Sequence, residues 1–542
     1  MTVRASEAEE IITDGDLLSY GSYIGGMNVD SQQWVYVLSA RSVLDDSFAS
    51  LTLKRRLDRG DLEPSAAVPG VVTGRVAVAD ARDIEASLAA AAAAAAEWRS
   101  APMSVRVDEW LSLMHDTLLA NQQTIEHMLT MEGHPLELAR WEISGMLEAC
   151  RPEAREFYRS QLWSEFQRAG QRQIVRRQPD GVVCVNPPAN APMVSALFGA
   201  LSIAAGNAVV IRAPRTAPLG VMYAVHELLV PTLRAVGAPP GTINAVCGHP
   251  GPVLNAWIES PHVNDVMYFG GANLGMKFER RCVEAGKKPI LELAGNDVVV
   301  VWHDAHLEHA AIALTECFFG SGQLCMIPNQ AVVHPAVADE LIALVVEKAK
   351  EIRSGYPDEE GVLLSPVLRH DGFQKCLADA LSKGASLVSG GRALRLDGTP
   401  DPAGFFLEPT VLRVDGLATA REVEAVEHET FFPLLPIVVP EPASDTRLIN
   451  SIVEFVNTNL YGLRNSVWAR DHDVIDRFLT EVNNGGLLKI NGSHIAFSAP
   501  LPSHGGTGLT GGAFGEANYP VLRTTRLQGV LITDADSRPR FR

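Results

Sequence analysis

Short apolar runs alternate with longer amphipathic stretches through the middle of the chain, between residues 181 and 299. Runs with the composition of β-strands lie at 181–185, 208–212, 242–246, 265–269, 290–293 and 298–301. Stretches with helical patterning, such as 218–236 and 274–285, separate these runs. The alternation predicts βαβ units, and therefore an α/β fold with a parallel, doubly wound sheet.

Helical patterning also precedes this region. The alanine run at 89–96 predicts a helix because Ala is the strongest helix former, and helical patterning continues over 105–121, 123–131 and 136–149. A second alternating region runs from 306 to about 507, with strands expected around 330–334 and 434–439. The first 75 residues predict little regular structure, with breaker clusters near 20–27 and 63–70. The polar tail after residue 533 is expected to fray.

Composition and charge narrow the class of protein. The 542 residues are enough for two or three packed domains, and 46% hydrophobic with 20% charged residues is an ordinary globular balance. A formal net charge of -18 argues against a nucleic-acid partner, which would need basic groups to neutralise its phosphates. No apolar run reaches the roughly 20 residues of a membrane span, and the acidic N-terminus lacks the features of a secretory signal. We therefore expect a cytoplasmic protein without a membrane partner.

The number and spacing of the cysteines also indicate a cytoplasmic protein. There are seven, an odd number, and they form neither CxxC motifs nor Cys/His pairs. This pattern is typical of reduced cytoplasmic thiols rather than of a disulfide framework or a zinc site, so no metal is expected. A small buried hydrophobic residue is the default interpretation of each.

Two segments carry a candidate polar group next to a predicted strand. Segment 187–192 (Pro-Pro-Ala-Asn-Ala-Pro) follows the first strand, and its Asn190 is either a turn residue or a rigidly held oxyanion donor. In segment 291–296 (Leu-Glu-Leu-Ala-Gly-Asn), Glu292 is either a buried general base of raised pKa or an edge-strand carboxylate that faces water.

Two further segments follow along the chain. Segment 318–325 ends in Gly-Ser-Gly-Gln-Leu-Cys, and Cys325 is either a nucleophile near backbone N–H groups or a structural cysteine. In segment 429–433, Glu429 and Phe431 either bind ribose hydroxyls and close over a nicotinamide, or form a helix-to-loop joint. Each segment is a weak signal alone, and their order and spacing carry the information.

In this order, the four segments resemble the aldehyde dehydrogenase superfamily. Residues 181–207 are similar to its strand, Pro-Trp-Asn-Phe-Pro loop and helix ending in Ala-Gly-Asn. Glu292 matches the Glu of its Leu-Glu-Leu-Gly-Gly signature, and Cys325 the Cys of its Gly-Gln-x-Cys signature. Cys325 follows Glu292 by 33 positions (325 − 292) and Asn190 by 135 (325 − 190), which suits the family. Further matches at 237–241, 404–410, 461–463 and 505–506 extend the resemblance from about 80 to 530.

The resemblance implies a Rossmann-like cofactor domain, an α/β catalytic domain and a small β oligomerisation element. We assign 76–155 and 179–293 to the cofactor domain, and 294–517 to the catalytic domain. Residues 156–178 and 518–542 are assigned to oligomerisation, as a dimer or tetramer, and 1–75 to an extension of unclear role.

The resemblance also implies a reaction. Cys325 attacks an aldehyde as a thiolate, while the Asn190 amide and the Cys325 backbone N–H hold the oxyanion. A hydride passes to a nicotinamide dinucleotide, and Glu292 activates the water that hydrolyses the thioester. The residues expected to bind the cofactor are Pro188, Arg212, Arg215, Gly270, Gly271, Gly275, Leu293, Glu429 and Phe431.

Three departures from the family pattern refine this expectation. Gly271 replaces the Ser of the family's Phe-Thr-Gly-Ser phosphate segment, so backbone donors remain but the hydroxyl does not. Arg215 replaces the Glu that selects NAD, and near Arg212 it favours NADP, unless it points to solvent. Ala189 and Ala191 replace Trp and Phe beside the Asn, which predicts room for a bulky, aromatic or long-chain aldehyde.

Two alternatives remain open. A CoA-acylating enzyme of the same fold would pass the acyl group to CoA instead of water, although such enzymes commonly lack the Glu that Glu292 matches. A non-catalytic member of the family would serve as a scaffold, although Asn190, Glu292 and Cys325 are all present.

Overall fold

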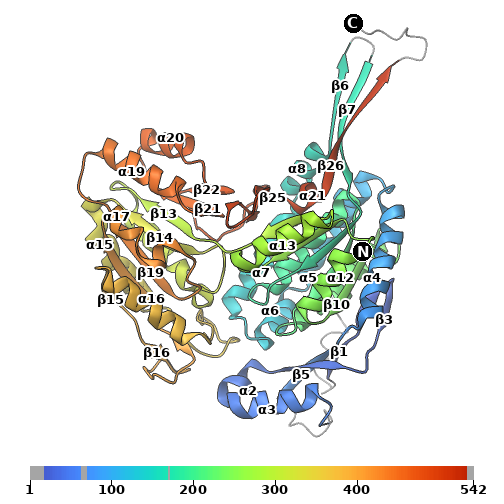
Figure 1. Ribbon diagram of the computed structural model, residues 1–542, viewed down its shortest axis with the longest axis horizontal. Helices are drawn as coiled ribbons and strands as arrows, with labels where there is room; N and C mark the ends of the chain where they lie inside the picture. Colours follow the sequence, from blue (N-terminus) through green and yellow to red (C-terminus); the bar gives the residue numbers. More distant parts are fainter. Residues whose placement is uncertain (1–16, 63–69, 169–170, 534–542) are drawn as a thin grey trace.

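A seven-stranded sheet forms the centre of the larger half of the molecule, on the right in Figure 1. The computed structural model describes residues 17–62, 70–168 and 171–533. The strand order is β12 (Lys288–Glu292), β11 (Asp265–Phe269), β8 (Val182–Asn186), β9 (Ala208–Ala213), β10 (Ile243–Cys247), β2 (Ser22–Ile24) and β3 (Met27–Val29). The first five strands are mutually parallel, and β2 is antiparallel to β10. The predicted α/β fold with a doubly wound sheet is thus confirmed.

Both faces of this sheet are buried, as is typical of parallel sheets. Along β8, Val183 and Val185 pack into one core with α5 (Trp110–Ala120), α6 (Gln122–Met131), α7 (Leu136–Cys150) and α9 (Pro192–Ala200). Val182 and Cys184 pack on the other face against α4 (Ala81–Trp98), α12 (Pro250–Glu259) and α13 (Ala272–Glu284). The predicted alanine-rich helix is α4, which buries Ala91, Ala94 and Ala95 in this second core. Small side chains let α4 lie close to the sheet.

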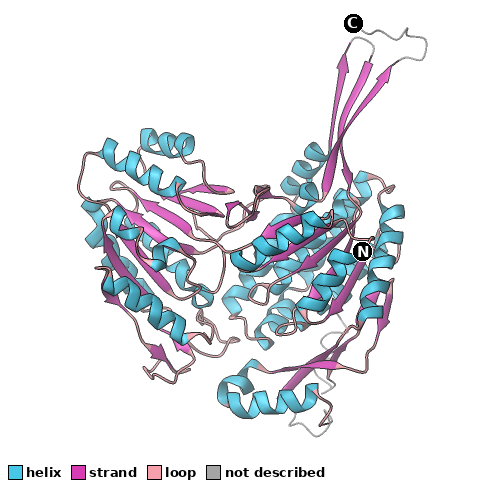
Figure 2. Cartoon of the chain, in the orientation of Figure 1, coloured by secondary structure: helices cyan, strands magenta, loops and turns pink. Residues whose placement is uncertain are grey.

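A second seven-stranded sheet forms the other half. Its order is β15 (Ser386–Ser389), β18 (Thr410–Asp415), β19 (Leu434–Val439), β14 (Pro328–Val333), β13 (Asp297–Val301), β21 (Arg464–Trp468) and β22 (Leu487–Ile490), and only β15 is antiparallel. The helices of this half include α14 (Leu307–Thr315), α15 (Ala338–Ala349), α16 (His370–Ser382), α19 (Asp445–Asn457) and α20 (His472–Glu481). Figure 2 shows them on both sides of the strands. Val299 and Val301 of β13 belong to the same apolar core as β8, so the two halves share a core.

A long three-stranded antiparallel sheet projects from the larger half (Figure 1). Its strands are β6 (Trp163–Arg168), β7 (Gln171–Pro179) and β26 (Thr525–Thr533). The expected frayed tail after residue 533 lies outside the described residues.

The N-terminal segment contains more regular structure than its patterning predicts. Beyond β2 and β3, it forms β1 (Leu18–Tyr20), β4 (Trp34–Leu38) and β5 (Val72–Ala77), and two helices connect β4 to β5. These helices are α2 (Ala40–Asp45) and α3 (Ser47–Asp58), of which only α3 buries a large apolar side chain, Leu57. The prediction of little regular structure was therefore wrong here, because strands of three to six residues give too short an alternation to recognise. Residues 1–16 and most of the 63–70 breaker cluster lie outside the described residues.

Membrane insertion receives no support from the helices: in the described ranges, none is long and apolar enough to cross a bilayer.

Candidate active site

A cavity of about 640 Å³ lies where the two seven-stranded sheets face each other. In the larger half, the strands that follow β8 in sequence are added first on one side of it (β9, β10) and then on the other (β11, β12). The crevice at the carboxyl ends of β8 and β11 is therefore the topological switch point, where open α/β sheets bind ligands. Residues following both strands line the cavity, including Pro188, Asn190 and Gly270.

The other wall comes from the amino ends of the second sheet. Cys325 lies just before β14, and Glu429 and Phe431 lie just before β19. All three line the cavity together with Glu292, the last residue of β12. The four segments singled out in the sequence therefore converge on one cavity, although more than 200 positions separate the first from the last (429 − 190 = 239).

Cys325 differs from the other cysteines in its exposure. Six of the seven are buried, and Cys325 alone is half-buried and open to the cavity. The turn before it is tight, with left-handed backbone at Gly320, Ser321 and Gly322 (φ 60°, 57° and 71°). The Ser321 hydroxyl donates to the Ser365 carbonyl (2.6 Å) and accepts from the Ser365 N–H (3.0 Å), which holds the one non-glycine residue of this turn in that conformation.

A second close approach fixes the Cys325 backbone. A Cβ on Gly295 would lie 1.9 Å from the Cys325 carbonyl oxygen, so only glycine fits at position 295. The Gly295 N–H in turn donates to the Glu429 carboxylate at 3.0 Å. The nucleophile loop, the segment after Glu292 and the Glu429 loop are thus held against one another.

Burial and the nearby charges together raise the pKa of the Cys325 thiol. Burial raises its pKa to about 12, and the nearby carboxylates of Glu429, Asp297 and Glu292 add to this effect. The Arg464 guanidinium opposes it. A positive charge brought into the cavity would favour the thiolate.

Glu292 is a buried carboxylate, as one of the two sequence interpretations requires. Its Oε2 accepts the Gly505 N–H at 2.7 Å, and its Oε1 accepts from the Asn518 side-chain amide. Burial raises its pKa to about 7, although both hydrogen bonds act in the opposite direction. Glu292 is therefore not a water-facing edge residue, and it titrates near neutral pH.

Asn190 reaches the cavity from the loop after β8. Its Nδ2 donates to the Gln323 carbonyl at 2.8 Å, which ties this loop to the turn before Cys325. His134 Nε2 lies 3.2 Å from the carbonyl of Ala189 and supports the same loop. Because a side-chain amide carries two N–H groups, one remains for an oxyanion.

The N-terminus of α13 offers donors for a phosphate. Gly270 and Gly271 precede this 13-residue helix, and no side chain caps its first N–H groups. A Cβ on Gly271 would meet open space, whereas one on Gly275 would collide with Leu293. Free N–H groups, the helix dipole and this close packing fit a dinucleotide pyrophosphate. Leu293 lines the cavity, and its backbone N–H is bonded to the Thr510 carbonyl at 3.0 Å.

The two arginines lie at the carboxyl end of β9. Arg212 is buried, and its guanidinium spans three strand ends, with Nε 2.5 Å from Asn186 Oδ1 and Nη1 3.2 Å from the Gly248 carbonyl. Arg215 is partly buried, contacts His249, and lines a second cavity of about 540 Å³. Neither arginine lines the first cavity.

Several aromatic side chains complete the wall of the cavity. The aromatic rings of Trp141, Phe269, Tyr461 and His504 line the cavity with Ala191, while Ala189 lines the second cavity. The ring of His504 packs against Phe198 with centroids 4.3 Å apart. Only the Gly-Gly turn at 505–506 lay near His504 in the sequence pattern, and nothing pointed to Trp141 or to Asn518.

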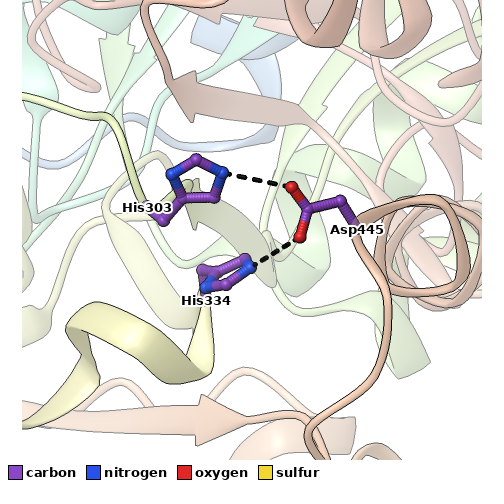
Figure 3. Close-up of side chains that lie close together, drawn as sticks. All are labelled: His303, His334 and Asp445. Atoms are coloured by element: carbon purple, nitrogen blue, oxygen red, sulfur yellow. Dashed lines mark hydrogen bonds and ion pairs between the residues drawn. The ribbon is translucent and has the colours of Figure 1, made fainter.

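A separate polar cluster lies at the carboxyl ends of β13 and β14 (Figure 3). His303 Nε2 and His334 Nε2 lie 3.2 and 3.5 Å from the two carboxylate oxygens of Asp445, a spacing at which a metal ion could bind. However, His334 Nδ1 accepts the Ala336 N–H at 3.1 Å, so the neutral ring carries its proton on Nε2. A metal would need that nitrogen unprotonated, so we interpret the cluster as two histidine rings held against the Asp445 carboxylate.

Comparison with known proteins agrees with this geometry. The chain is 29% identical over 463 residues to the succinate-semialdehyde dehydrogenase [NADP(+)] of Escherichia coli K12, covering 82% of this chain and 90% of that protein. It is 28% identical over 479 residues to the vanillin dehydrogenase of Pseudomonas fluorescens, covering 85% and 93%. A solved NAD-dependent aldehyde dehydrogenase from Sinorhizobium meliloti superimposes with a TM-score of 0.78 at 22% identity, over 97% of each chain.

The model of the aldehyde dehydrogenase family matches residues 60–526, most of the chain and all of the cavity described above. The chain therefore belongs to the aldehyde dehydrogenase family, whose members are NAD(P)-dependent oxidoreductases.

Proposed function

We propose that the protein oxidises an aldehyde to its carboxylic acid through a thioester on Cys325. The observation that carries the proposal is the convergence of Cys325, Glu292 and Asn190 on one cavity at the switch point of the cofactor sheet. A nucleophile, a base near neutral pKa and an amide donor are the three groups that this two-step chemistry needs.

In the first step, the thiol gives its proton to solvent water, and the Cys325 sulfur bonds to the aldehyde carbon. The carbonyl oxygen becomes an oxyanion, which the free N–H of the Asn190 amide and the Cys325 backbone N–H stabilise. An oxidised nicotinamide bound in the cavity would supply the hydride acceptor. Its positive charge would also stabilise the thiolate of Cys325, whose pKa the surroundings raise. Loss of the hydride from carbon leaves a thioester.

In the second step, Glu292 removes a proton from water, and the hydroxide attacks the thioester carbon. The C–S bond breaks, the acid is released, and the proton held by Glu292 passes to the sulfur to regenerate the Cys325 thiol. A pKa of about 7 leaves a substantial fraction of Glu292 ionised at neutral pH and still basic enough to accept a proton. The Gly505 N–H and the Asn518 amide orient the carboxylate.

The cofactor residues fit a dinucleotide with a 2′-phosphate. The uncapped N-terminus of α13 would hold the pyrophosphate, and Glu429 and Phe431 line the cavity near Cys325, where a nicotinamide ribose would lie. Arg215 is a cation where the family usually has a carboxylate, and this supports NADP over NAD. We therefore propose NADP as the preferred cofactor.

An aromatic or otherwise bulky aldehyde is the proposed substrate. Ala191 gives room next to Asn190, and the aromatic rings of Trp141, Phe269 and His504 line the same cavity. Flat apolar rings pack favourably on such walls. The vanillin dehydrogenase among the relatives acts on an aromatic aldehyde by its name, which is consistent with this proposal.

An aldehyde panel with NADP and NAD, with and without CoA, tests the function. We expect the acid and reduced cofactor from aromatic aldehydes, and neither product from Cys325→Ala. Equal efficiency with acetaldehyde would contradict the substrate class. Acyl-CoA as the product would favour the CoA-acylating alternative, and no thiol-dependent reduction of either cofactor would favour a non-catalytic member.

A further inference from the structure

The segment between β4 and β5 reaches the cofactor side of the molecule. After β5, the Val78 backbone bridges to Cys247, the last residue of β10, and the Ala79 N–H donates to the Cys247 carbonyl at 2.8 Å. The inserted helices α2 and α3 lie at the other end of the β4/β5 hairpin, at the bottom of Figure 1. Residues of both helices nevertheless line the same cavity as Arg215 and Thr216 of the turn after β9. The family match begins at residue 60, so both helices precede it.

Lys54 of α3 points back toward this edge. Its Nζ donates to the Tyr36 carbonyl and lies 3.3 Å from Asp58 Oδ2. Lys54 and Arg215 line the same cavity of about 540 Å³, on opposite sides of the contact between the insertion and the cofactor domain. An ammonium has three N–H donors, and these two contacts leave one for a ligand.

Three cations surround one point at the end of β10. Arg212, Arg215 and Lys54 all act electrostatically on Cys247, and Arg215 also disfavours the charged form of Lys54. The ion pairs of the described residues include neither Arg212 nor Arg215, and Asp58 is the carboxylate that pairs with Lys54. Glu132 lines the same cavity, but its carboxylate is occupied by the N–H groups of Leu219 and Gly220.

This concentration of positive charge is unusual in a chain with a net charge of -18. Like charges brought together raise the free energy of the protein unless an anion accompanies them. A phosphate monoester carries up to two negative charges and accepts several charge-assisted hydrogen bonds, so it suits two adjacent cations.

We propose that Lys54, supplied by the inserted helix α3, binds the 2′-phosphate of NADP together with Arg215. The inference rests on the proposed use of NADP. It adds a residue from outside the family match, and it gives the N-terminal segment a role in cofactor selection. Arg215 contributes from the turn after β9, where the adenosine ribose is expected, and α3 closes over it from the other side.

Binding titrations test the proposal without relying on turnover. The dissociation constants of NADP and NAD are measured by quenching of tryptophan fluorescence and by the thermal shift each cofactor causes. Lys54→Gln should weaken NADP binding about tenfold, in line with the loss of one charge-assisted contact, and reduce its salt dependence. Binding of NAD, which lacks the phosphate, should change much less.

Two further variants distinguish the loss of the Lys54 charge from a general disturbance of α3. Lys54→Arg keeps the cation and should retain most of the NADP affinity, while Arg55→Gln removes an exposed charge from the same helix and should have no effect on the preference. Far-ultraviolet circular dichroism checks that α3 is intact in each.

The outcomes are distinguishable. If the wild-type protein prefers NADP and Arg215→Gln abolishes the preference while Lys54→Gln does not, the inference is wrong and the proposed cofactor stands. If Lys54→Gln weakens NADP and NAD equally, its role is structural and the inference is likewise wrong. If the wild-type protein binds NADP no more tightly than NAD, both the proposed cofactor and the inference fail.

Discussion

Glu292 is the residue whose titration should be visible in the kinetics. Its pKa is raised to about 7, so the fraction that is ionised, and with it hydrolysis of the thioester, should rise with pH through about 7. Glu292→Gln should remove this dependence and slow steady-state turnover by roughly 10²–10⁴-fold, the usual contribution of a general base. The first equivalent of reduced cofactor should still form in a burst, which stopped-flow absorbance records.

Glu422→Gln is the matched control, because Glu422 is an exposed carboxylate outside the cavity. An unchanged steady-state rate in the Glu292→Gln enzyme would mean that Glu292 is not the general base of thioester hydrolysis.

Cys325 should react as a thiol of high pKa in the free protein and become more reactive when the positively charged, oxidised cofactor binds. Its pKa of about 12 lies above the ordinary value, so in the free protein the thiolate is scarce at neutral pH and alkylation by iodoacetamide should keep accelerating above pH 9. Oxidised cofactor should accelerate alkylation at pH 7, because it brings positive charge beside the sulfur. Mass spectrometry of the labelled peptide measures both rates. A plateau below pH 9 without cofactor would contradict the surroundings described for this thiol.

Arg215 should determine which cofactor binds. Arg215→Glu replaces the cation with a carboxylate, which repels a 2′-phosphate and can bond the ribose hydroxyls of NAD. We expect NADP binding to weaken at least tenfold and the preference to reverse, as measured by the two dissociation constants. A preference that survives this change would place the 2′-phosphate elsewhere.

At the scale of the element, the parallel strands were the most predictable feature. The runs at 265–269 and 434–439 coincide with β11 and β19, and the other predicted strands differ from the observed ones by one or two residues at one or both ends. Both faces of these strands are buried, so their apolar runs are continuous and stand out from the chain around them.

The site was predictable only where a motif and its spacing were present. Asn518 holds Glu292, and His504 forms part of the cavity wall, but both arrive from β23 (His504–Gly505) and β25 (Ala517–Asn518), more than 200 residues after β12 (504 − 292 = 212). Such contacts arise from the packing of the two halves, which single-sequence patterns do not report. The insertion that carries Lys54 was missed for a related reason, since its helices are short and weakly amphipathic.

A substitution at Gly295, in the turn after Glu292, tests how tightly this turn packs against the Cys325 loop. A Cβ at position 295 would overlap the Cys325 carbonyl, so Gly295→Ala should displace the nucleophile and lower kcat/KM by roughly a hundredfold, the effect expected of an approximately 1 Å misplacement. Gly251→Ala is the control, because its Cβ would meet nothing within 4 Å. Steady-state kinetics of both variants decides the matter, and an unaffected Gly295→Ala enzyme would mean that the loop adapts.

On the scale of the whole molecule, the site depends on how two similar sheets are placed. The carboxyl ends of β8 and β11 lie opposite the amino ends of β14 and β19. Loops that follow the strands of one sheet and loops that precede the strands of the other therefore line one cavity. The apolar core shared by β8 and β13 fixes this arrangement. The catalytic groups therefore come from both halves, and neither half alone contains the site.

The projecting sheet of β6, β7 and β26 suggests how the molecules assemble. Paired residues of an antiparallel sheet point to the same face, and the register places Leu531 opposite Gln173, which in turn pairs with Phe166. Leu527 and Val175 lie on that face as well, and these four apolar side chains are between 39 and 65% exposed. We propose that this face is covered by a second copy of the chain, in a dimer or a tetramer.

Charge on this face should therefore dissociate the assembly. Leu527→Glu combined with Leu531→Glu would bury two unpaired carboxylates per chain, which costs several kcal/mol per ion, on the order of the stability of many interfaces. Sedimentation velocity should show a dimer or tetramer for the wild-type protein and a monomer for the double variant. Leu479→Glu is the control, because Leu479 is an exposed apolar residue on α20, far from this sheet in Figure 1. A wild-type monomer, or a double variant that still assembles, would mean that this face has another use.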